Sequence, residues 1–285
     1  MPSPVADIFL RAAELAAGDG QRAGNVVAVP AGCEVVVAGD IHGHRANLNR
    51  IIAWADLPAH PQRRLVVQEV IHGPPDAQTG QDRSVECLLR VARLLASCPR
   101  QVVVLLGNHD IAQAGGREIT KAGQGVCEAF ARGVEYACGG VDAPAVLEAI
   151  SAFLLSLPLA ARCPGGVVMV HSLPSPRRTE LAGQQIPAGA YGPQSLARGG
   201  GVYEWTWGRG HTPDQIARLA AANDAGCFVL GHEPVEEGCR VLCDQAVVLD
   251  SQHDRGAVLR FASDAHLSGP EAAALATPIA ALRRQ

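Results

Sequence analysis

The sequence predicts an α/β fold in which two mixed β-sheets pack as a sandwich and helices flank them. Three observations support this prediction: short β-branched runs recur along the chain, helical patterns separate several of them, and 48% of the 285 residues are hydrophobic, enough to bury a large core. Alternation of strand and helix in the first half favours parallel pairing, because parallel strands need crossover connections. The closely spaced strands near the C-terminus favour an antiparallel sheet.

Seven strands are expected where apolar, β-branched runs stop sharply. They cover residues 34–38, 65–71, 101–106, 167–170, 227–230, 246–249 and 257–261. Helices are expected over residues 44–54, 85–96, 142–155 and 212–222, where apolar residues recur at helical spacing, with Asp142 and Thr212 as N-caps. Residues 1–19 form an amphipathic pattern and do not resemble a signal peptide.

The organisation favours a single domain over residues 1–285, with a core of about 34–262. The stretch 172–201 is rich in Pro, Gly and Arg and is expected to be a surface loop or a lid. No long linker and no internal repeat interrupts the chain.

Charge and cysteine content narrow the functional classes. The formal net charge is −4 with a pI near 6.2, which indicates no basic face, so no nucleic-acid partner is expected. Nine cysteines, an odd number without a CxxC pair, indicate reduced thiols in the cytoplasm and not a disulfide framework. No uninterrupted apolar run is long enough to span a bilayer, so no membrane partner is expected.

Polar side chains follow four of the predicted strands, at the point where each strand ends. The strand at 34–38 runs into Gly39-Asp40-Ile41-His42-Gly43, and the strand at 101–106 runs into Gly107-Asn108-His109-Asp110. The strands at 167–170 and 227–230 end on His171 and on Gly231-His232. Sites in open α/β sheets form outside the carboxyl ends of strands. Each segment alone is compatible with an ordinary turn, but the four together indicate one site.

The residue types at these strand ends suit metal-assisted hydrolysis. Asp, Asn and His supply the oxygen and imidazole donors that Mn, Fe or Zn accept. Two such ions ~3.5–4 Å apart share a carboxylate and clamp a phosphoryl group for in-line attack, while a nearby histidine protonates the leaving oxygen. We therefore expect two divalent metal ions, with Mn preferred over Fe or Zn, and a metal-bound hydroxide as the nucleophile.

With these motifs, the sequence resembles the calcineurin-like metallophosphoesterases, and most closely their serine/threonine phosphoprotein phosphatase branch. That family follows the order GDxHG, GDxVDRG, GNHE and two later histidines. Residues 39–43 and 107–110 resemble the first and third motifs, with aspartate as the last residue of the third. The segments 170–172 and 229–238 resemble the two histidine segments, and Arg209-Gly210 resembles a phosphate-binding Arg-Gly pair. The likeness covers roughly residues 34–259.

The resemblance implies a set of metal ligands. Asp40 and His42 would bind the first ion, and Asn108, His171 and His232 would bind the second. Asn108 would also contact the phosphate of the substrate.

The resemblance also implies catalytic and phosphate-binding roles. His109 would be the general acid, with Asp82 as a possible partner. Asp110 would either orient His109 or simply end the strand. Arg209 would hold the phosphate through its planar, bidentate guanidinium, with Arg83 as a further phosphate ligand.

The second motif departs from the family pattern. The chain reads Gln68-Glu69-Val70-Ile71-His72-Gly73 where GDxVDRG is expected, and Asp82-Arg83 opens a helix further on. Glu69 would take the bridging position, and its extra methylene would be absorbed by a backbone shift or a longer metal separation. Either His72 or the displaced Asp82-Arg83 would replace the Asp-Arg pair of the family. Alternatively, Asp82 and Arg83 cap and pair on the first turn of a surface helix.

Three functions are open at this point. The first is a metal-dependent phosphomonoester hydrolase similar to serine/threonine protein phosphatases, acting on a phosphorylated protein or a small phosphoester. The second is a diadenosine polyphosphate or nucleotide phosphohydrolase, because the same superfamily core serves both. The third is a catalytically impaired scaffold relative, which the altered second motif would favour.

Overall fold

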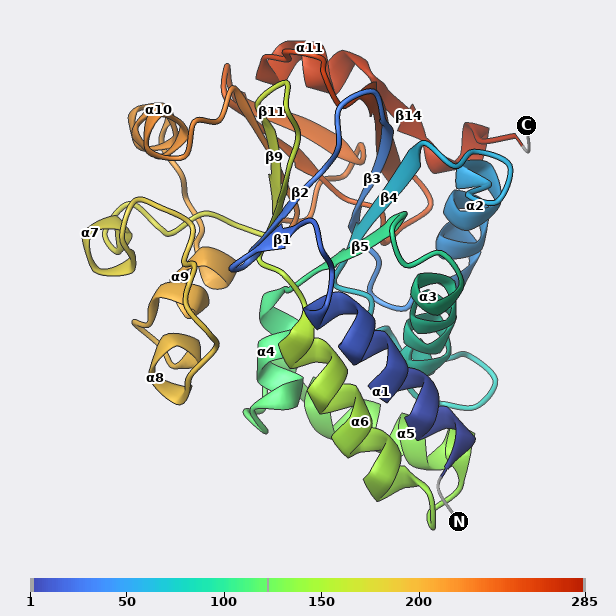
Figure 1. Cartoon of the computed structure of the whole chain (residues 1–285). Helices are drawn as coiled ribbons and strands as arrows, with labels where there is room; N and C mark the ends of the chain where they lie inside the picture. The colour runs from blue at the N-terminus through green and yellow to red at the C-terminus, as the bar shows by residue number, and fades with distance from the viewer. Residues whose placement is uncertain (1–2, 122, 284–285) are drawn as a thin grey trace.

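The computed structural model describes residues 3–121 and 123–283, and its strands form the two predicted mixed sheets (Figure 1). One sheet has the order β14-β13-β3-β4-β5, formed by Ala276–Pro278, Ala257–Ala262, Glu34–Asp40, Arg63–Gln68 and Val102–Leu105. The other has the order β1-β2-β8-β9-β10-β12-β11, formed by Arg22–Ala23, Val26–Ala28, Ala160–Arg162, Val167–Val170, Cys227–Leu230, Ala246–Leu249 and Cys239–Cys243. A separate short pair consists of β6 (Thr120–Lys121) and β7 (Gln124–Gly125).

Helices cover the outer faces of the two sheets. Helices α1, α3, α5 and α6 pack together on one side of the molecule, and α7 to α10 lie on another (Figure 1). The helices are α1 (Pro4–Ala17), α2 (Arg45–Ala55), α3 (Ser84–Ser97), α4 (Asn108–Ala114), α5 (Val126–Cys138), α6 (Ala143–Ser156), α7 (Thr179–Ala182), α8 (Pro193–Leu196), α9 (Gly201–Trp207), α10 (Pro213–Ala222), α11 (Gly269–Ala274) and a 3₁₀ turn, η1 (Ile279–Ala281). Among the residues described, no helix is both long enough and apolar enough to cross a bilayer.

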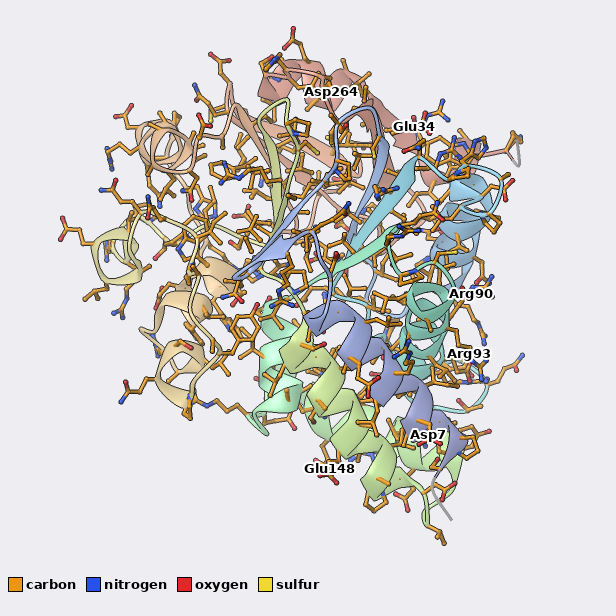
Figure 2. All side chains as sticks on the ribbon, in the orientation of Figure 1. Asp7, Glu34, Arg90, Arg93, Glu148 and Asp264 are labelled. Carbon is orange, nitrogen blue, oxygen red and sulfur yellow. The ribbon has the colours of Figure 1, made fainter. Side chains whose placement is uncertain are left out.

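The central strands are buried on both faces. In β3, Val35 and Val37 belong to the apolar cluster shared by strands of both sheets, whereas Val36 packs into the cluster that includes the helices. Such strands read as continuous apolar runs because neither face contacts water. Charged side chains such as Arg90 and Glu148 lie on the outer faces of α3 and α6 (Figure 2). The core therefore holds the strand ends in fixed relative positions.

Pairing in the first half of the chain confirms the parallel prediction, because β3 pairs parallel with β4 and β4 with β5. The antiparallel prediction for the C-terminal strands is wrong for β10 and β12, which are parallel. The physical reason is β11, which follows β10, lies at the sheet edge and forms an antiparallel hairpin with β12. The chain therefore passes through β11 and returns beside β10 in the same direction.

The four predicted helices are present, and none of their ends differs from the prediction by more than one residue. Thr212 caps α10 as predicted, since its side-chain oxygen accepts a hydrogen bond from the Gln215 N–H. Asp142 occupies the N-cap position of α6 but forms no side-chain capping hydrogen bond. The stretch 172–201 is not a loop throughout, because it contains α7 and α8. All nine cysteines are free, as predicted.

Candidate metal centre

Five strand ends bring the predicted ligand residues to one place. The ends of β3, β4 and β5 are adjacent in one sheet, and the ends of β9 and β10 are adjacent in the other. The two sheets meet through a parallel bridge between Asp40 and Asp250. The side chains delivered are those of Asp40, His42, Glu69, Asn108, His109, His171 and His232, all buried except His109, which is partly exposed.

Glu69 lies at the centre of this cluster. Its Oε2 is 3.5 Å from His42 Nε2 and 4.0 Å from His109 Nε2. Its Oε1 is 3.6 Å from His171 Nε2 and accepts a 2.7 Å hydrogen bond from the His109 backbone N–H. The two oxygens of one carboxylate therefore face two different groups of histidines, the geometry that a bridging carboxylate requires.

Two groups of side chains could each hold a metal ion, and both contain Glu69. One is His42, Glu69 and His109, and the other is Asp40, Glu69 and His171. The ligand atoms within each group lie within 4.8 Å of one another. Asp40 Oδ1 lies 3.6 Å from His171 Nδ1, so the structure places Asp40 beside the second histidine group and not with His42 alone.

Backbone hydrogen bonds hold the loops that carry these ligands. The backbone N–H groups of Ile41 and His42 donate to the Glu69 carbonyl at 3.1 and 2.8 Å. The His232 N–H donates to both carboxylate oxygens of Asp40, at 3.1 and 3.0 Å. The first motif is thus tied to the second through Glu69 and to the last histidine segment through Asp40.

The same loops contain strained backbone. Six non-glycine residues in the described chain have a positive φ, and four of them belong to this site: His42, Glu69, His72 and His232. Such conformations cost on the order of 1–3 kcal/mol each and persist only where surrounding contacts impose them. This strain also explains why β4 ends at Gln68, three residues before the predicted end, because Glu69 leaves the extended conformation.

Two glycines leave room for the carboxylates. A Cβ on Gly107 would lie 2.1 Å from Glu69 Oε1, and a Cβ on Gly231 would lie 2.3 Å from Asp40 Oδ1. Real Cβ atoms do not approach other atoms so closely. Glycine is therefore required at both positions for the observed carboxylate positions.

Hydrogen bonds orient the imidazole rings toward the cluster. His42 Nδ1 donates to the Ile71 carbonyl at 2.9 Å, so in the neutral ring Nε2 carries no proton and turns its lone pair toward Glu69. His171 Nδ1 lies 2.8 Å from Gln68 Oε1, and its Nε2 lies 2.9 Å from Asn108 Oδ1. In both His42 and His171, the partner on Nδ1 fixes the orientation of the ring and so the direction in which Nε2 points.

Burial sets the protonation of the cluster. It raises the pKa of Asp40 from 3.8 to about 7, and the neighbouring Asp250 carboxylate adds to this, while the His232 N–H opposes it. Burial, followed by the charge of Arg209, lowers the pKa of His232 to about 3. Burial also lowers the pKa of His171 well below its usual 6.5. The imidazoles of His171 and His232 are therefore neutral, as metal ligation requires, whereas the charge of Arg209 offsets only part of the effect of burial on Asp40.

One atom tests whether the residues fit a bound metal. His232 Nε2 is buried and has no hydrogen-bond partner among the described residues. Buried polar atoms without partners are rare in native proteins and call for an unseen ligand. The donor set of imidazoles, carboxylates and an amide oxygen is one that Mn, Fe and Zn accept. The residues fit a pair of divalent ions.

A second histidine stands behind His109. His72 Nδ1 lies 2.8 Å from His109 Nδ1, and His72 Nε2 lies 2.9 Å from Gln113 Oε1. With the Gln113 amide in this orientation, His72 donates through Nε2 and accepts through Nδ1. His109 then donates through Nδ1 and directs Nε2 toward Glu69. Of the two predicted partners for His109, the structure brings His72 to it.

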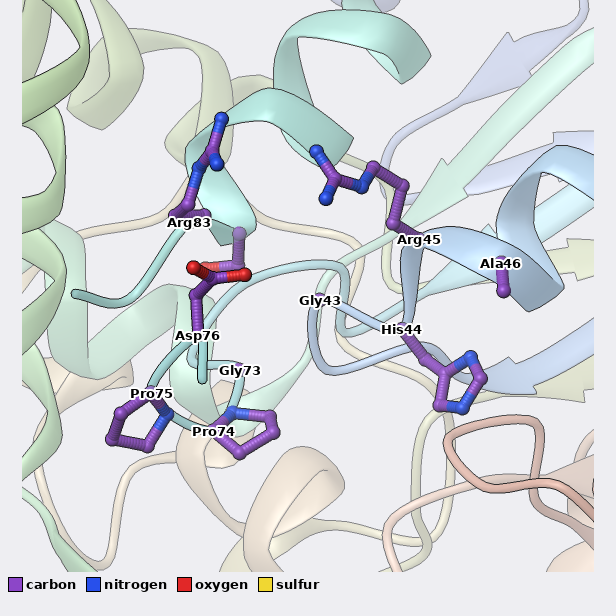
Figure 3. Close-up of a pocket in the computed structure, with 10 residues that line it drawn as sticks. Gly43, His44, Arg45, Ala46, Gly73, Pro74, Pro75, Asp76 and Arg83 are labelled. Carbon is purple, nitrogen blue, oxygen red and sulfur yellow. The ribbon is translucent and has the colours of Figure 1, made fainter. Parts of the chain in front are cut away.

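Asp82 and Arg83 lie elsewhere. Asp82 Oδ1 accepts a 2.8 Å hydrogen bond from the Ser84 N–H at the start of α3. Arg83 pairs with Glu86 and lines a separate cavity with Arg45 (Figure 3). The prediction that Arg83 is a phosphate ligand is therefore not supported by its position. The loop between His72 and Asp82 lengthens the connection and moves both residues away from their family positions.

Asp110 has a structural partner. Its Oδ2 accepts a 2.8 Å hydrogen bond from the Gly107 N–H and caps α4. Burial raises the pKa of Asp110 to about 7. Asp110 therefore holds the loop that carries Asn108 and His109 through the backbone of Gly107.

A cavity of about 590 Å³ opens onto the cluster. Its lining residues include Asp40, Glu69, Asn108, Trp207 and Arg209. The Arg209 side chain is exposed at this cavity, so its guanidinium is available to an anion. Arg209 therefore shares this cavity with Asp40, Glu69 and Asn108.

Three residues that contact this site were not predicted from the sequence. Gln113 contacts His72 and lies four residues after His109 on α4, so helical spacing could have identified it. Gln68 contacts His171 from the end of β4. Asp250 accepts a hydrogen bond from the Val235 N–H at 2.9 Å and holds the loop after His232. No sequence signal distinguishes the last two from ordinary buried residues.

This fold, with histidines and carboxylates gathered at its strand ends, defines a metallophosphoesterase. The chain belongs to the calcineurin-like phosphoesterase family, whose sequence profile matches residues 34–268. The family and the fold predicted by the sequence resemblance are both confirmed.

Solved structures share this fold at low sequence identity. A protein serine/threonine phosphatase from Saccharomyces cerevisiae, with similarity to human phosphatase PP5, matches with a TM-score of 0.66 and 14% identity, covering 92% of this chain and 83% of the yeast chain. A cold-active protein-tyrosine phosphatase from a psychrophilic Shewanella species matches with a TM-score of 0.57 and 14% identity, covering 88% of this chain and 82% of that one. No curated protein sequence gave a significant match.

Proposed function

We propose that the protein is a phosphomonoester hydrolase that uses two divalent metal ions. The observation that carries this proposal is the position of Glu69, whose two carboxylate oxygens face His42 on one side and His171 on the other. Glutamate in place of aspartate is accommodated by the left-handed backbone at Glu69 and by the missing side chain of Gly107. The altered second motif therefore still presents a carboxylate between His42 and His171.

The metal ligands follow from the two groups around Glu69. Asp40, His42, Asn108, His171 and His232 would hold the ions together with Glu69. When bound, such ions supply Lewis-acid stabilisation of the charge on a phosphoryl group. Manganese is the ion we expect first, with iron or zinc as substitutes. The nine free cysteines support a reducing, cytoplasmic environment.

His109 is positioned to move a proton at the leaving oxygen. Its Nε2 faces the cluster and its Nδ1 contacts His72. When His109 is protonated on both nitrogens, its Nδ1–H donates to His72, and its Nε2–H would donate to the leaving group. Neutral His72 would thus accept the hydrogen bond from His109 that an aspartate accepts in the family pattern.

Arg209 would bind the phosphate. Its guanidinium is exposed to the cavity, and its charge reaches Asp40 and His232, whose pKa values it lowers. A planar guanidinium suits bidentate contact with a phosphoryl group. Asn108 lies on the floor of the same cavity and would add a second contact.

A serine/threonine phosphatase-like activity is the finer proposal. The family and the fold support phosphoester hydrolysis. The yeast structure carries a serine/threonine phosphatase title and the Shewanella structure a tyrosine phosphatase title, so the fold alone does not choose the substrate residue. The sequence resemblance to the serine/threonine branch favours the former.

The test uses purified protein supplied with Mn²⁺. It should release phosphate from p-nitrophenyl phosphate and from a phosphoserine peptide, and Asp40→Asn and His232→Ala should each abolish the release. Full activity in both variants would refute the proposal. A diadenosine polyphosphate assayed in parallel distinguishes the nucleotide hydrolase, since one substrate class should be preferred by orders of magnitude.

A further inference from the structure

A second cavity, of about 320 Å³, adjoins the metal centre. His42 and His72 line it on the side of the cluster, and Pro74, Pro75 and Val126 contribute apolar walls. His42 is also part of the larger cavity that contains Arg209, so the two spaces meet at that histidine. A phosphoester held at the centre can therefore extend its organic part into the second cavity.

The wall of this cavity is the segment that interrupts the second motif. Pro75 and Asp82 form an antiparallel bridge, and the Asp76 N–H donates to the Gln81 carbonyl at 2.8 Å. The loop between Pro75 and Asp82 is closed by these bonds. Pro74 and Pro75, which lead into it (Figure 3), have restricted backbones. The insertion that displaced Asp82 from its expected place thus builds a firm pocket wall.

Among the described residues that line this cavity, Asp82 is the one with an acidic side chain. The residue is 3% exposed, and its Oδ1 accepts the hydrogen bond from the Ser84 N–H, which fixes the carboxyl group. Its Oδ2 is buried and has no hydrogen-bond partner among the described residues. A buried carboxylate oxygen without a partner is unfavourable, and burial accordingly raises the pKa of Asp82. A ligand that donates to Oδ2 would relieve this cost.

We propose that this cavity is a substrate subsite in which Asp82 Oδ2 receives a cationic nitrogen, an ammonium or guanidinium, carried by the organic part of the phosphomonoester. This inference rests on the proposed phosphoesterase function and adds the class of leaving group. A neutral donor would form a hydrogen bond but leave the carboxylate charge uncompensated. A cation would form the hydrogen bond and also compensate the charge, and such charge-assisted bonds are roughly twice as strong as neutral ones. The apolar walls would contact the carbon chain that carries the nitrogen.

Two aryl phosphates of similar size test the subsite: 4-(aminomethyl)phenyl phosphate, which is cationic, and 4-methylphenyl phosphate, which is not. For the Mn²⁺-loaded wild type, kcat/KM for the cationic ester should exceed that for the neutral ester by about tenfold or more. In Asp82→Asn this ratio should fall close to one, whatever happens to each rate separately. Asp82→Ser, which keeps an acceptor for the Ser84 N–H, should do the same. A ratio near one in the wild type, or a ratio kept in both variants, would overturn the proposal.

The matched control is Glu148→Gln, a carboxylate-to-amide change on the exposed face of α6 (Figure 2), which should keep the wild-type ratio. A second measurement does not depend on turnover. Saturation-transfer NMR should detect benzylamine on the wild-type protein and detect much less on Asp82→Asn. Equal binding to the two proteins, or none to the wild type, would also overturn the subsite. Asp82-dependent binding in a protein that hydrolyses neither ester would refute the phosphoesterase function and leave the subsite standing.

Discussion

His72 Nδ1 lies 2.8 Å from His109 Nδ1, so the altered second motif contacts the third motif through a pair of histidines. Gln113 holds the far nitrogen of His72 at 2.9 Å. The family pattern that the sequence resembles has an aspartate in this place, and here a neutral ring takes over the contact. The histidine pair fixes which nitrogen of His109 faces Glu69.

This contact makes His72 a positioning residue for His109. His72→Leu should lower kcat about 10- to 100-fold and change KM little, because the ring orients the proton donor and does not touch the phosphate. His72→Asp should retain more activity than His72→Leu, since a carboxylate accepts the same hydrogen bond. Steady-state phosphate release from p-nitrophenyl phosphate measures both. Wild-type kcat in His72→Leu would show that the pair has no role in turnover.

Gly107 should be indispensable because of Glu69. Gly107→Ala places a Cβ 2.1 Å from Glu69 Oε1 and must displace the carboxylate, which should lower activity about 100-fold and weaken metal binding. Gly20→Ala is the matched control, because nothing lies within 4 Å of its Cβ. Adding Glu69→Asp to Gly107→Ala removes one methylene and should restore part of the lost activity. An active Gly107→Ala protein with full metal content would contradict the bridging position of Glu69.

The two predicted phosphate-binding arginines should behave differently. Arg209→Ala should raise KM roughly 10- to 100-fold, because a charge-assisted contact with the phosphate is lost. Arg83→Ala should change KM less than about twofold, since Arg83 pairs with Glu86 in a separate cavity. Initial rates over a range of substrate concentrations measure the two KM values. Equal effects of the two substitutions would contradict the positions described for them.

Metal affinity should rise with pH through about 7. In the metal-free fold the pKa of Asp40 is raised from 3.8 to about 7, so the carboxyl is largely protonated at about pH 6 and must lose its proton to bind an ion. Without metal, the stability contributed by the neutral form is complete below 3.8 and is lost as the pH rises through about 7. Titration calorimetry at about pH 6, in two buffers with different ionisation enthalpies, should show proton release on Mn²⁺ binding. The release should be smaller at about pH 8, and an equal release at both would contradict the assignment.

The positions of the candidate ligands could be predicted from the sequence where a ligand directly follows a strand. Asp40, His42, His171 and His232 lie at strand ends, and the order of apolar runs is enough to bring parallel neighbours to one edge. The central strands were recognisable because burial on both faces makes them continuously apolar. Glu69 was predictable as the central carboxylate from the resemblance alone, and the structure places it between both histidine groups.

Contacts that depend on loop conformation could not be predicted. The loop from Pro75 to Asp82 is closed by a bridge, so Asp82 and Arg83 do not line the cavity that contains Arg209. No local sequence pattern indicates that the loop closes. The left-handed backbone at Glu69 and His72 is imposed by tertiary contacts and runs against residue preference. The parallel pairing of β10 with β12 depends on where β11 docks, which spacing along the chain does not determine.

The most direct test of the bridging role of Glu69 is an anomalous-scattering crystal structure of the protein prepared with Mn²⁺. It should show two ions ~3.5–4 Å apart, with one Glu69 oxygen on each. One ion should lie beside His42 and the other beside His171 and Asp40. A single ion, or two ions without Glu69 between them, would contradict the account.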